Sequence, residues 1–132
     1  ITMIIYNAIR TPDGTVIESK HRWDYQAHTD ANGQVYAVDG GNDYIRRIGP
    51  WDYTELSVTP DDEHEVIRKV FKWRSYGKSG NEPARDTALK DLTDNHIQNI
   101  LLTQVNLDAT VKWIFCNEQE YRKYHNITSN ED

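Results

Sequence analysis

Cations and aromatic side chains that could hold a nucleotide are concentrated between residues 66 and 80. This stretch, VIRKVFKWRSYGKSG, contains five of the 15 basic residues, three aromatic residues and no acid. A cation beside an aromatic ring often holds a nucleotide, because the ring stacks on the base while the cation meets the phosphate. The same pattern also occurs at the end of an ordinary amphipathic helix. Both interpretations stand on the residues alone.

Most of the cations in this stretch fit a solvated helix face. On a helix, Arg68, Lys69 and Lys72 project away from the apolar side chains and lie near the end that favours cations. Arg74 falls within the apolar arc beside Trp73, where a guanidinium must find an anion, a carbonyl oxygen or an aromatic face. We therefore expect Arg74 to make either a structural ion pair or a ligand contact.

The segment from Lys20 to Tyr25 is the second concentration of charged and aromatic side chains. Alternation along a strand places Arg22 and Asp24 on one face and Trp23 and Tyr25 on the other. The simpler interpretation buries both aromatic rings in the core and leaves Arg22 paired with Asp24 on the surface. In the functional interpretation, Arg22 contacts a phosphate and an aromatic ring lies nearby.

The expected helices add further candidates. Glu118 and Arg122 lie within the apolar arc of the last helix, four residues apart, and can pair with each other. Trp113 and Tyr124 lie on the opposite side of that helix, which suggests a subunit interface. Asn95 projects away from the core face of the preceding helix and can hydrogen-bond to an adenine edge or a ribose, although simple exposure is the more ordinary interpretation.

Signatures of catalysis are weak. The five histidines do not occur at metal-ligand spacing, and no second cysteine accompanies Cys116. His28 and Asp30 lie in a turn, and Asp39 and Asp43 flank two glycines. These residues could form a carboxylate dyad, but turns are naturally rich in Asp and Gly. No nucleophile elbow, P-loop or dinucleotide fingerprint occurs. We expect no catalytic residue, no metal and no cofactor.

Composition bounds the class of partner. The chain has 132 residues, a formal net charge of −6 and a single cysteine. The acidic balance argues against a nucleic-acid polymer as partner, whereas a small anionic ligand needs only a local cationic pocket. One cysteine excludes an intrachain disulfide and fits a reducing compartment. No apolar run is long enough to cross a bilayer, so we expect no membrane contact.

The first half of the sequence predicts antiparallel strands. Two turn signals, Pro12-Asp13-Gly14 and Asp30-Ala31-Asn32-Gly33, each separate stretches rich in β-branched and aromatic residues. The connections are too short for crossover helices, which favours an antiparallel meander. The expected strands are residues 3–10, 15–20, 23–28, 34–39, 43–48 and 55–58.

The second half predicts helices. Thr59-Pro60-Asp61-Asp62 is typical of a helix start, and that helix is expected to run to about Arg74, followed by a polar loop over 75–91. Thr93 should cap a second helix to about Gln104, and Asp108 a third to about Tyr124. The expected fold is α+β in a single domain over 1–132: a sheet over 3–58, two to three helices over 59–125, and a frayed tail over 126–132.

Several motifs together resemble a family of small tailed-phage proteins. They cover most of the chain and are Ile9-Arg-Thr-Pro-Asp-Gly-Thr15, His21-Arg-Trp-Asp-Tyr25, His28-Thr-Asp-Ala-Asn-Gly33, Val38-Asp-Gly-Gly41, Asp43-Tyr-Ile-Arg-Arg47, Lys72-Trp-Arg-Ser-Tyr-Gly-Lys78, Leu89-Lys-Asp-Leu92 and Glu120-Tyr-Arg-Lys123. The best-known relative is the Thoeris anti-defence sponge of the first type. The resemblance implies a non-catalytic, cytoplasmic trap that assembles from dimers into hexamers. It would sequester cyclic ADP-ribose signals in the infected bacterium, and some members also bind cyclic oligonucleotides of the CBASS pathway.

Side-chain chemistry then supplies a ligand set for this expectation. Guanidinium groups for phosphate would come from Arg22, Arg74, Arg85 and Arg122, a stacking ring from Trp23 or Trp73, and a base or ribose contact from Asn95. Two other functions remain open. One is a small phage hydrolase that uses Asp39, Asp43 or His28. The other is a phage inhibitor that binds a host protein through exposed aromatic residues such as Trp51, Tyr53 and Trp113.

Overall fold

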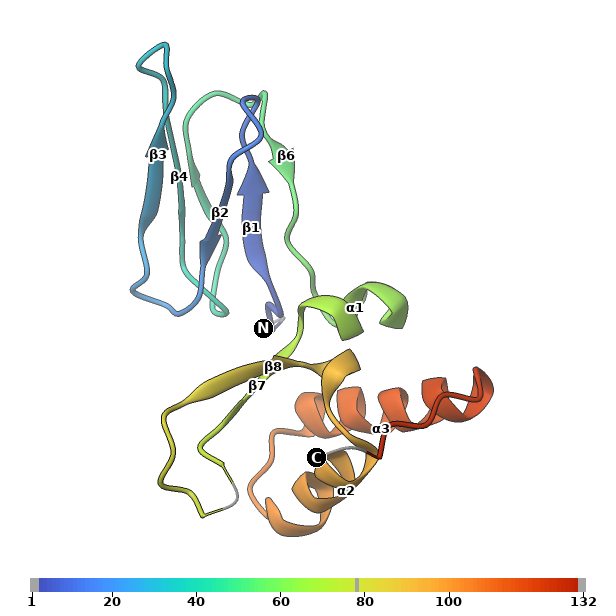
Figure 1. Cartoon of the computed structure of the whole chain (residues 1–132). Coiled ribbons are helices and arrows are strands. Elements are labelled where there is room, and N and C mark those ends of the chain that lie inside the picture. The colour runs from blue at the N-terminus through green and yellow to red at the C-terminus, as the bar shows by residue number, and fades with distance from the viewer. Residues whose placement is uncertain (1–2, 78, 131–132) are drawn as a thin grey trace. The chain divides into compact units, whose positions relative to one another are not determined.

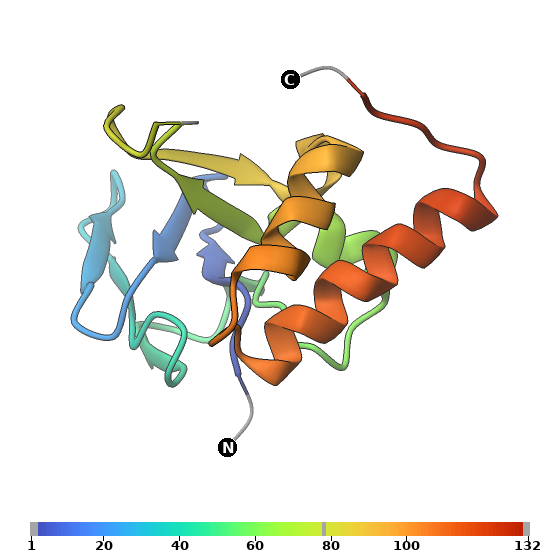
Figure 2. The same ribbon diagram turned by 90° about the horizontal axis from the view of Figure 1, so that it is seen from below.

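The fold is α+β, as predicted: antiparallel strands come first and three helices follow. The computed structural model describes residues 3–77 and 79–130. Lys78 of the basic stretch and residues 131–132 of the expected tail lie outside the described residues. The chain divides into two compact units with the boundary between Asp62 and Glu63 (Figures 1 and 2). Each unit is described by itself.

Two three-stranded antiparallel sheets make up the first unit. Strand order is β2-β1-β6 in one sheet and β3-β4-β5 in the other. The strands are β1 (Asn7–Arg10), β2 (Val16–Ser19), β3 (Gln26–Thr29), β4 (Val35–Asp39), β5 (Arg46–Ile48) and β6 (Thr54–Glu55). Both predicted hairpin turns are present, between β1 and β2 and between β3 and β4. The strands do not form one continuous meander, because β6 returns to pair with β1.

The core of the first unit lies between its two sheets. Ile9 of β1 is fully buried against Tyr36 and Val38 of β4, and Ile17 and Tyr53 pack around them. Ile9 and Ile17 are register partners on neighbouring strands, so both reach the same face of their sheet. Both faces of the central strands are covered, because Ala8 of β1 and Ala37 of β4, which point away from these residues, are buried as well.

Two polar side chains, those of the buried Asn7 and the half-buried Arg47, join the two sheets at one end. Asn7 of β1 donates through Nδ2 to the carbonyl oxygens of Asp39 and Gly41 at 3.0 Å and of Tyr44 at 3.2 Å. Arg47 of β5 donates to Asn7 Oδ1 at 2.8 Å and to both carboxylate oxygens of Glu55 on β6. Since these contacts join strands of both sheets, the 39–44 turn is fixed relative to β1.

The second unit combines a hairpin with three α-helices. Its elements are α1 (His64–Val70), β7 (Lys72–Ser75), β8 (Arg85–Ala88), a 3₁₀ helix η1 (Leu89–Asp91), α2 (Asp94–Thr103) and α3 (Ala109–Tyr124). Both predicted caps are confirmed: Thr93 Oγ1 accepts from the His96 amide, and Asp108 Oδ1 accepts from the amides of Thr110 and Val111. Phe71, which is buried, and Trp73, which is half-buried, pack edge-on against the buried Phe115 of α3.

The expected helix from Thr59 to Arg74 is much shorter than predicted. Thr59 and Asp62 form a local turn instead, because the Thr59 amide donates to Asp62 Oδ2 at 2.8 Å. The helix ends at Val70, and the backbone of Phe71 is already extended, with φ −68° and ψ 128°. Residues 72–75 then pair with residues 85–88, so the loop expected over 75–91 contains β8 and η1. Long-range pairing outweighs local helix propensity here.

The tail after α3 is not frayed over its described part. The Asp94 amide donates to the Ser129 carbonyl oxygen at 2.7 Å, and the Ser129 amide donates to Asp94 Oδ2 at 3.0 Å. The Ile127 amide donates to the carbonyl oxygen of Arg122 at 2.8 Å. These bonds attach the tail to the first turn of α2, which overrides the expectation from its polar composition.

Replacing Asn7 with alanine should destabilise the first unit. The substitution leaves three carbonyl oxygens and one arginine donor without their buried partner, which costs roughly 1–3 kcal/mol. We expect a lower urea midpoint for Asn7→Ala, measured by circular dichroism. Asn95→Ala is the matched control, because Asn95 is exposed and the same deletion there should leave the midpoint unchanged. Equal midpoints for wild type and Asn7→Ala would contradict this interpretation.

Candidate ligand-binding site

The segment that connects β2 to β3 displays a tryptophan to solvent. Trp23 lies in a turn rather than in a strand, since β3 begins only at Gln26. Its side chain is 78% exposed, and Tyr25 is exposed as well. The expectation that strand alternation buries both rings in the core is therefore wrong. The turn breaks the alternation, and a large indole is left available for stacking.

Arg22 lies over the exposed indole. Its guanidinium carbon is 5.0 Å from the centroid of the Trp23 ring, which is cation–π geometry. Arg22 Nε also lies 3.7 Å from Asp43 Oδ2, and both side chains are largely exposed. The predicted pairing of Arg22 with Asp24 does not occur. Asp24 instead accepts from the Lys20 amide and from Gln26 Nε2, and these two bonds lower the pKa of its carboxyl group.

The 20–25 segment is a fixed loop. Ser19 Oγ donates to the Asp24 carbonyl oxygen at 2.6 Å and accepts from the Gly41 amide at 2.8 Å. Gly41 has a positive φ of 53°, and a Cβ atom at this position would overlap with the backbone carbonyl of His21. Only glycine allows this close approach between the two loops. The Arg22–Trp23 pair is thus held in place by the same 39–44 turn that Asn7 organises.

The acids and the histidine considered for hydrolysis each have a different partner. Asp39 Oδ1 accepts from the Gly40 amide at 2.9 Å, and its Oδ2 lies 3.5 Å from Arg46 Nη1. Asp43 faces Arg22, as described above. His28 Nε2 lies 2.7 Å from Asp13 Oδ2, in the turn between β1 and β2. Asp39, Asp43 and His28 therefore each contact a different structural partner.

The β7–β8 hairpin places its candidate residues on two faces. Trp73 packs against Phe115 with ring centroids 5.4 Å apart, whereas Arg74 lies on the opposite face of β7. Arg74 is exposed and makes two hydrogen bonds to Asp86, its register partner, at 2.9 and 3.2 Å. The expectation that Arg74 lies within an apolar arc is wrong because β7 is a strand. Of the two contacts expected for Arg74, the structural ion pair is present, and its partner is Asp86.

Arg85 and Asn95 are the exposed candidates of the second unit. Arg85 begins β8, opposite Ser75, and no hydrogen bond or ion pair of its side chain occurs within residues 3–77 and 79–130. Asn95 lies in the first turn of α2 and points to solvent, as predicted. Trp113 and Tyr124 of α3 are exposed, also as predicted.

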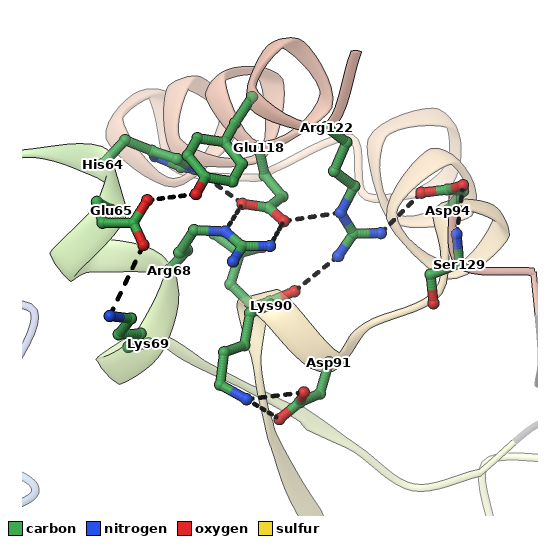
Figure 3. A network of polar contacts seen from close by, with 12 residues as sticks. His64, Glu65, Arg68, Lys69, Lys90, Asp91, Asp94, Glu118, Arg122 and Ser129 are labelled. Atoms are coloured by element: carbon green, nitrogen blue, oxygen red, sulfur yellow. Dashed lines mark hydrogen bonds and ion pairs between the residues drawn. The ribbon is translucent and has the colours of Figure 1, made fainter. Parts of the chain in front are cut away.

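Arg122 belongs to a buried network instead of an open site (Figure 3). Its side chain is 4% exposed. It donates to Glu118 Oε2 and Asp94 Oδ1 at 2.7 Å and to the carbonyl oxygen of Leu89 at 3.0 Å. The predicted pair with Glu118 is confirmed. Since these donors are engaged, the structure does not favour Arg122 as a phosphate contact.

Glu118 is the acceptor at the centre of this network. Its side chain is fully buried and accepts from His64 Nε2 at 2.8 Å, from Arg68 Nε and Nη2 at 3.0 and 2.9 Å, and from Arg122. Burial by itself raises the pKa of this carboxyl group, but the hydrogen bonds from His64, Arg68 and Arg122 outweigh burial and lower the pKa to about 2. The carboxylate is therefore ionised at neutral pH.

The sequence did not predict that Arg68 and His64 belong to this network. Arg68 was expected on a solvated face, yet its side chain is mostly buried and its guanidinium lies 4.4 Å from the Tyr121 ring centroid. Lys69, in contrast, is exposed and lies 3.7 Å from Glu65, as that expectation requires. A usable signal was the i, i+4 spacing of His64 and Arg68, which matches that of Glu118 and Arg122 on the facing helix.

The geometry does not point to a metal site or a membrane segment. In residues 3–77 and 79–130, no group of three His, Cys, Asp or Glu side chains is arranged to hold a metal ion. No helix in that part of the chain is both long enough and apolar enough to cross a bilayer. Comparison with protein-family models, with curated proteins and with solved structures gives no match. Support for the candidate ligand-binding site therefore comes from its geometry and not from a known relative.

Replacing Glu118 with glutamine should destabilise the second unit strongly. The neutral amide would leave Arg68 buried without its counter-charge and would take from Arg122 one of its two carboxylate partners, at a cost of roughly 3–5 kcal/mol at neutral pH. Because the folded pKa of Glu118 is lowered, its stabilisation is present above pH 4.5 and is lost as the pH falls toward 2. The difference in unfolding free energy between wild type and Glu118→Gln should shrink over that range. Glu120→Gln, an exposed change on the same helix, should have little effect at any pH.

Replacing Gly41 with alanine should displace the Arg22–Trp23 loop. The new Cβ overlaps with the His21 carbonyl, so the 20–25 segment must move and the protein should lose more than about 1 kcal/mol of stability. We expect a shifted indole N–H resonance of Trp23 in a ¹⁵N-labelled sample. Gly14→Ala is the control: Gly14 also has a positive φ, of 90°, but open space surrounds its Cβ position. An unmoved Trp23 signal in Gly41→Ala would refute the proposed coupling.

Proposed function

We propose that the chain is a phage anti-defence sponge that binds and sequesters cyclic nucleotide immune signals without cleaving them. The ligand class is cyclic ADP-ribose isomers, with cyclic oligonucleotides as a second class. The protein would act in the cytoplasm of the infected bacterium, as a homo-oligomer built from dimers. The motif resemblance to small tailed-phage proteins suggests this role, and one structural observation makes it chemically specific.

That observation is the exposed Arg22–Trp23 pair on its fixed loop. A purine ring can stack on the indole, which is 78% exposed, while the guanidinium meets a phosphate. Asp43 is the group that Arg22 would exchange for a phosphate, and their separation of 3.7 Å in an exposed setting makes this a weak contact to give up. A loop fixed before binding loses little conformational entropy on binding, which favours slow release.

The structure narrows the ligand set that side-chain chemistry suggested. In the first unit, Arg22 and Trp23 are the members that it favours. In the second unit, taken by itself, Arg85 is an exposed cation available for phosphate and Asn95 an exposed amide available for a base or ribose. Arg74 would have to leave Asp86, and Trp73 would have to leave Phe115, so both are secondary. Arg122 is omitted because Glu118, Asp94 and the Leu89 carbonyl engage it.

The proposed oligomer would use the outer face of α3. Trp113 and Tyr124 lie eleven residues apart, which is close to three helical turns, so both project from the same side of the helix. Both rings are exposed although they are large and apolar. Aromatic residues of this kind are enriched at subunit interfaces. Analytical ultracentrifugation of Trp113→Ala would test this part independently of ligand binding.

Titration calorimetry tests ligand binding directly. Cyclic ADP-ribose isomers and cyclic di- and trinucleotides would be titrated into wild type, Trp23→Ala and Arg22→Ala. We expect micromolar or tighter binding of at least one ligand by wild type, and about tenfold or greater loss in each variant. Trp51→Ala is the matched control, since Trp51 is an even more exposed tryptophan at a different place in the first unit. The proposal would be contradicted if none of these ligands gave a heat of binding at micromolar concentration.

Two further readouts separate the rival functions. After denaturation of the complex, chromatography should recover the bound nucleotide unchanged, whereas a new peak would support the hydrolase that uses Asp39, Asp43 or His28. A host-protein inhibitor would ignore every nucleotide and depend on exposed aromatic residues such as Trp51 or Trp113, while Tyr53 is partly buried in the core. The structure favours the sponge over the hydrolase in one respect, because the three hydrolytic candidates each have a separate structural partner.

A further inference from the structure

The end of the first unit opposite the Arg22–Trp23 loop carries a second exposed tryptophan. The β1–β2 turn, the β3–β4 turn and the β5–β6 connection lie together at this end (Figure 1). Trp51 belongs to the β5–β6 connection and is 92% exposed, more than any other large hydrophobic side chain in the described parts of the chain. The proposed nucleotide function does not use it. An exposed indole of this kind is the residue type that most often dominates a protein interface.

The loop that carries Trp51 is fixed on both sides. Gly49 has a φ of 120° and runs close to the Val35 carbonyl oxygen, so that the chain leaves β5 in one defined direction. Asp52 Oδ1 accepts from the Tyr36 hydroxyl at 2.8 Å, and Tyr53 packs against the core between the sheets. Since its neighbours are anchored, Trp51 is presented with little conformational freedom left in its backbone. Binding through it would therefore carry a small ordering cost.

Three carboxylates surround the same end. Asp13, Asp30 and Asp52 come from the three connections, and all of them act on the Tyr36 hydroxyl. Burial, the hydrogen bond to Asp52 and the charges of the three acids raise the pKa of Tyr36 to about 12. Asp30 Oδ1 also accepts from the amides of Asn32 and Gln34. Hydrogen bonds therefore hold the negatively charged side chains of Asp30 and Asp52 in place at this end.

The cations near this end leave Asp30 and Asp52 without an ion-pair partner within residues 3–77 and 79–130. His28 is bound to Asp13, and Arg10 lies at the end of β1, where strand alternation directs it to the face of its sheet away from Ile9 and the core. An exposed apolar ring at the same end as these acids matches a partner that offers positive charge. Arginine suits the arrangement best, because its planar guanidinium can stack on an indole and donate to a carboxylate at once.

We infer that Trp51, together with Asp30 and Asp52 at the same end of the first unit, forms a docking surface for an arginine-bearing basic segment of another protein. A guanidinium from that segment would stack on the Trp51 indole, and its neighbours would pair with the two carboxylates. This surface goes beyond the proposed nucleotide sequestration and lies at the other end of the unit. A sponge with such a surface could be brought to a basic protein without covering the Arg22–Trp23 loop.

NMR titration with a defined probe tests the inference. The ¹⁵N-labelled full chain has four tryptophans and so four indole N–H signals. The probe is an octapeptide of alternating arginine and serine, and the control probe replaces each arginine with glutamate. We expect a saturable shift of the Trp51 indole signal with the arginine peptide and none with the glutamate peptide. The affinity should fall as salt is raised, because the contact depends on exposed charges.

Two variants separate the contribution of the Trp51 indole to binding from that of the two carboxylates. Trp51→Ala should weaken binding of the arginine peptide about tenfold or more. The double change Asp30→Asn, Asp52→Asn keeps the acceptor oxygens and removes both charges, so it should weaken binding while leaving the fold intact. Trp23→Ala should bind the peptide as wild type does, and Trp51→Ala should bind cyclic nucleotides as wild type does, which keeps the two surfaces distinguishable. An unmoved Trp51 signal, or equal shifts with both peptides, would overturn the inference.

Discussion

A carboxylate that is wholly out of water organises the second unit. Glu118 is the one acceptor shared by His64, Arg68 and Arg122, so the charges of two helices are satisfied only if α1 and α3 pack against each other. An ionised group in this position is tolerated because its donors are already in place. Arg122 extends the same requirement to η1 and α2 through the Leu89 carbonyl and Asp94. The polar network thus specifies which helices meet, while Ile97, Ile114 and Phe115 supply the buried apolar surface.

In the first unit, the side-chain amide of Asn7 joins separate elements in a similar way. Asn7 offers its donors to the 39–44 turn and its oxygen to Arg47, and Arg47 reaches Glu55 on the other sheet. Gly41 then lets the 20–25 segment approach the turn, so the position of the Arg22–Trp23 pair depends on a buried residue of β1. The two exposed tryptophans of this unit, Trp23 and Trp51, are both held on anchored loops. Exposure of these rings is therefore built into the backbone and does not come from loose segments.

Local signals in the sequence were sufficient for some elements and not for others. The turn residues at 12–14 and 30–33 and the caps Thr93 and Asp108 act within a few residues, and each was predicted correctly. Lys72 to Ser75 has both helical and strand character, and only its pairing with residues 85–88 decides for a strand. Trp23 was misplaced for a related reason, because the contact between Gly41 and His21 joins residues twenty apart. The i, i+4 pair Glu118 and Arg122 was predictable, whereas their partners on α1 depend on helix packing.

The bonds between Asp94 and Ser129 close residues 94–129 into a ring of chain. Both ends of the α2–α3 segment are pinned to each other, and Asp94 also holds Arg122. A helix whose last turn is held by nothing else ordinarily opens from that end inward, with amide exchange fastest in the last turn. Here the last turn of α3 is enclosed by the ring, and its amides can exchange only when the tail detaches or the whole segment opens. Protection against exchange should therefore be nearly even along α3, and a fusion at the carboxyl end would be best joined beyond Ser129 so that the ring stays closed.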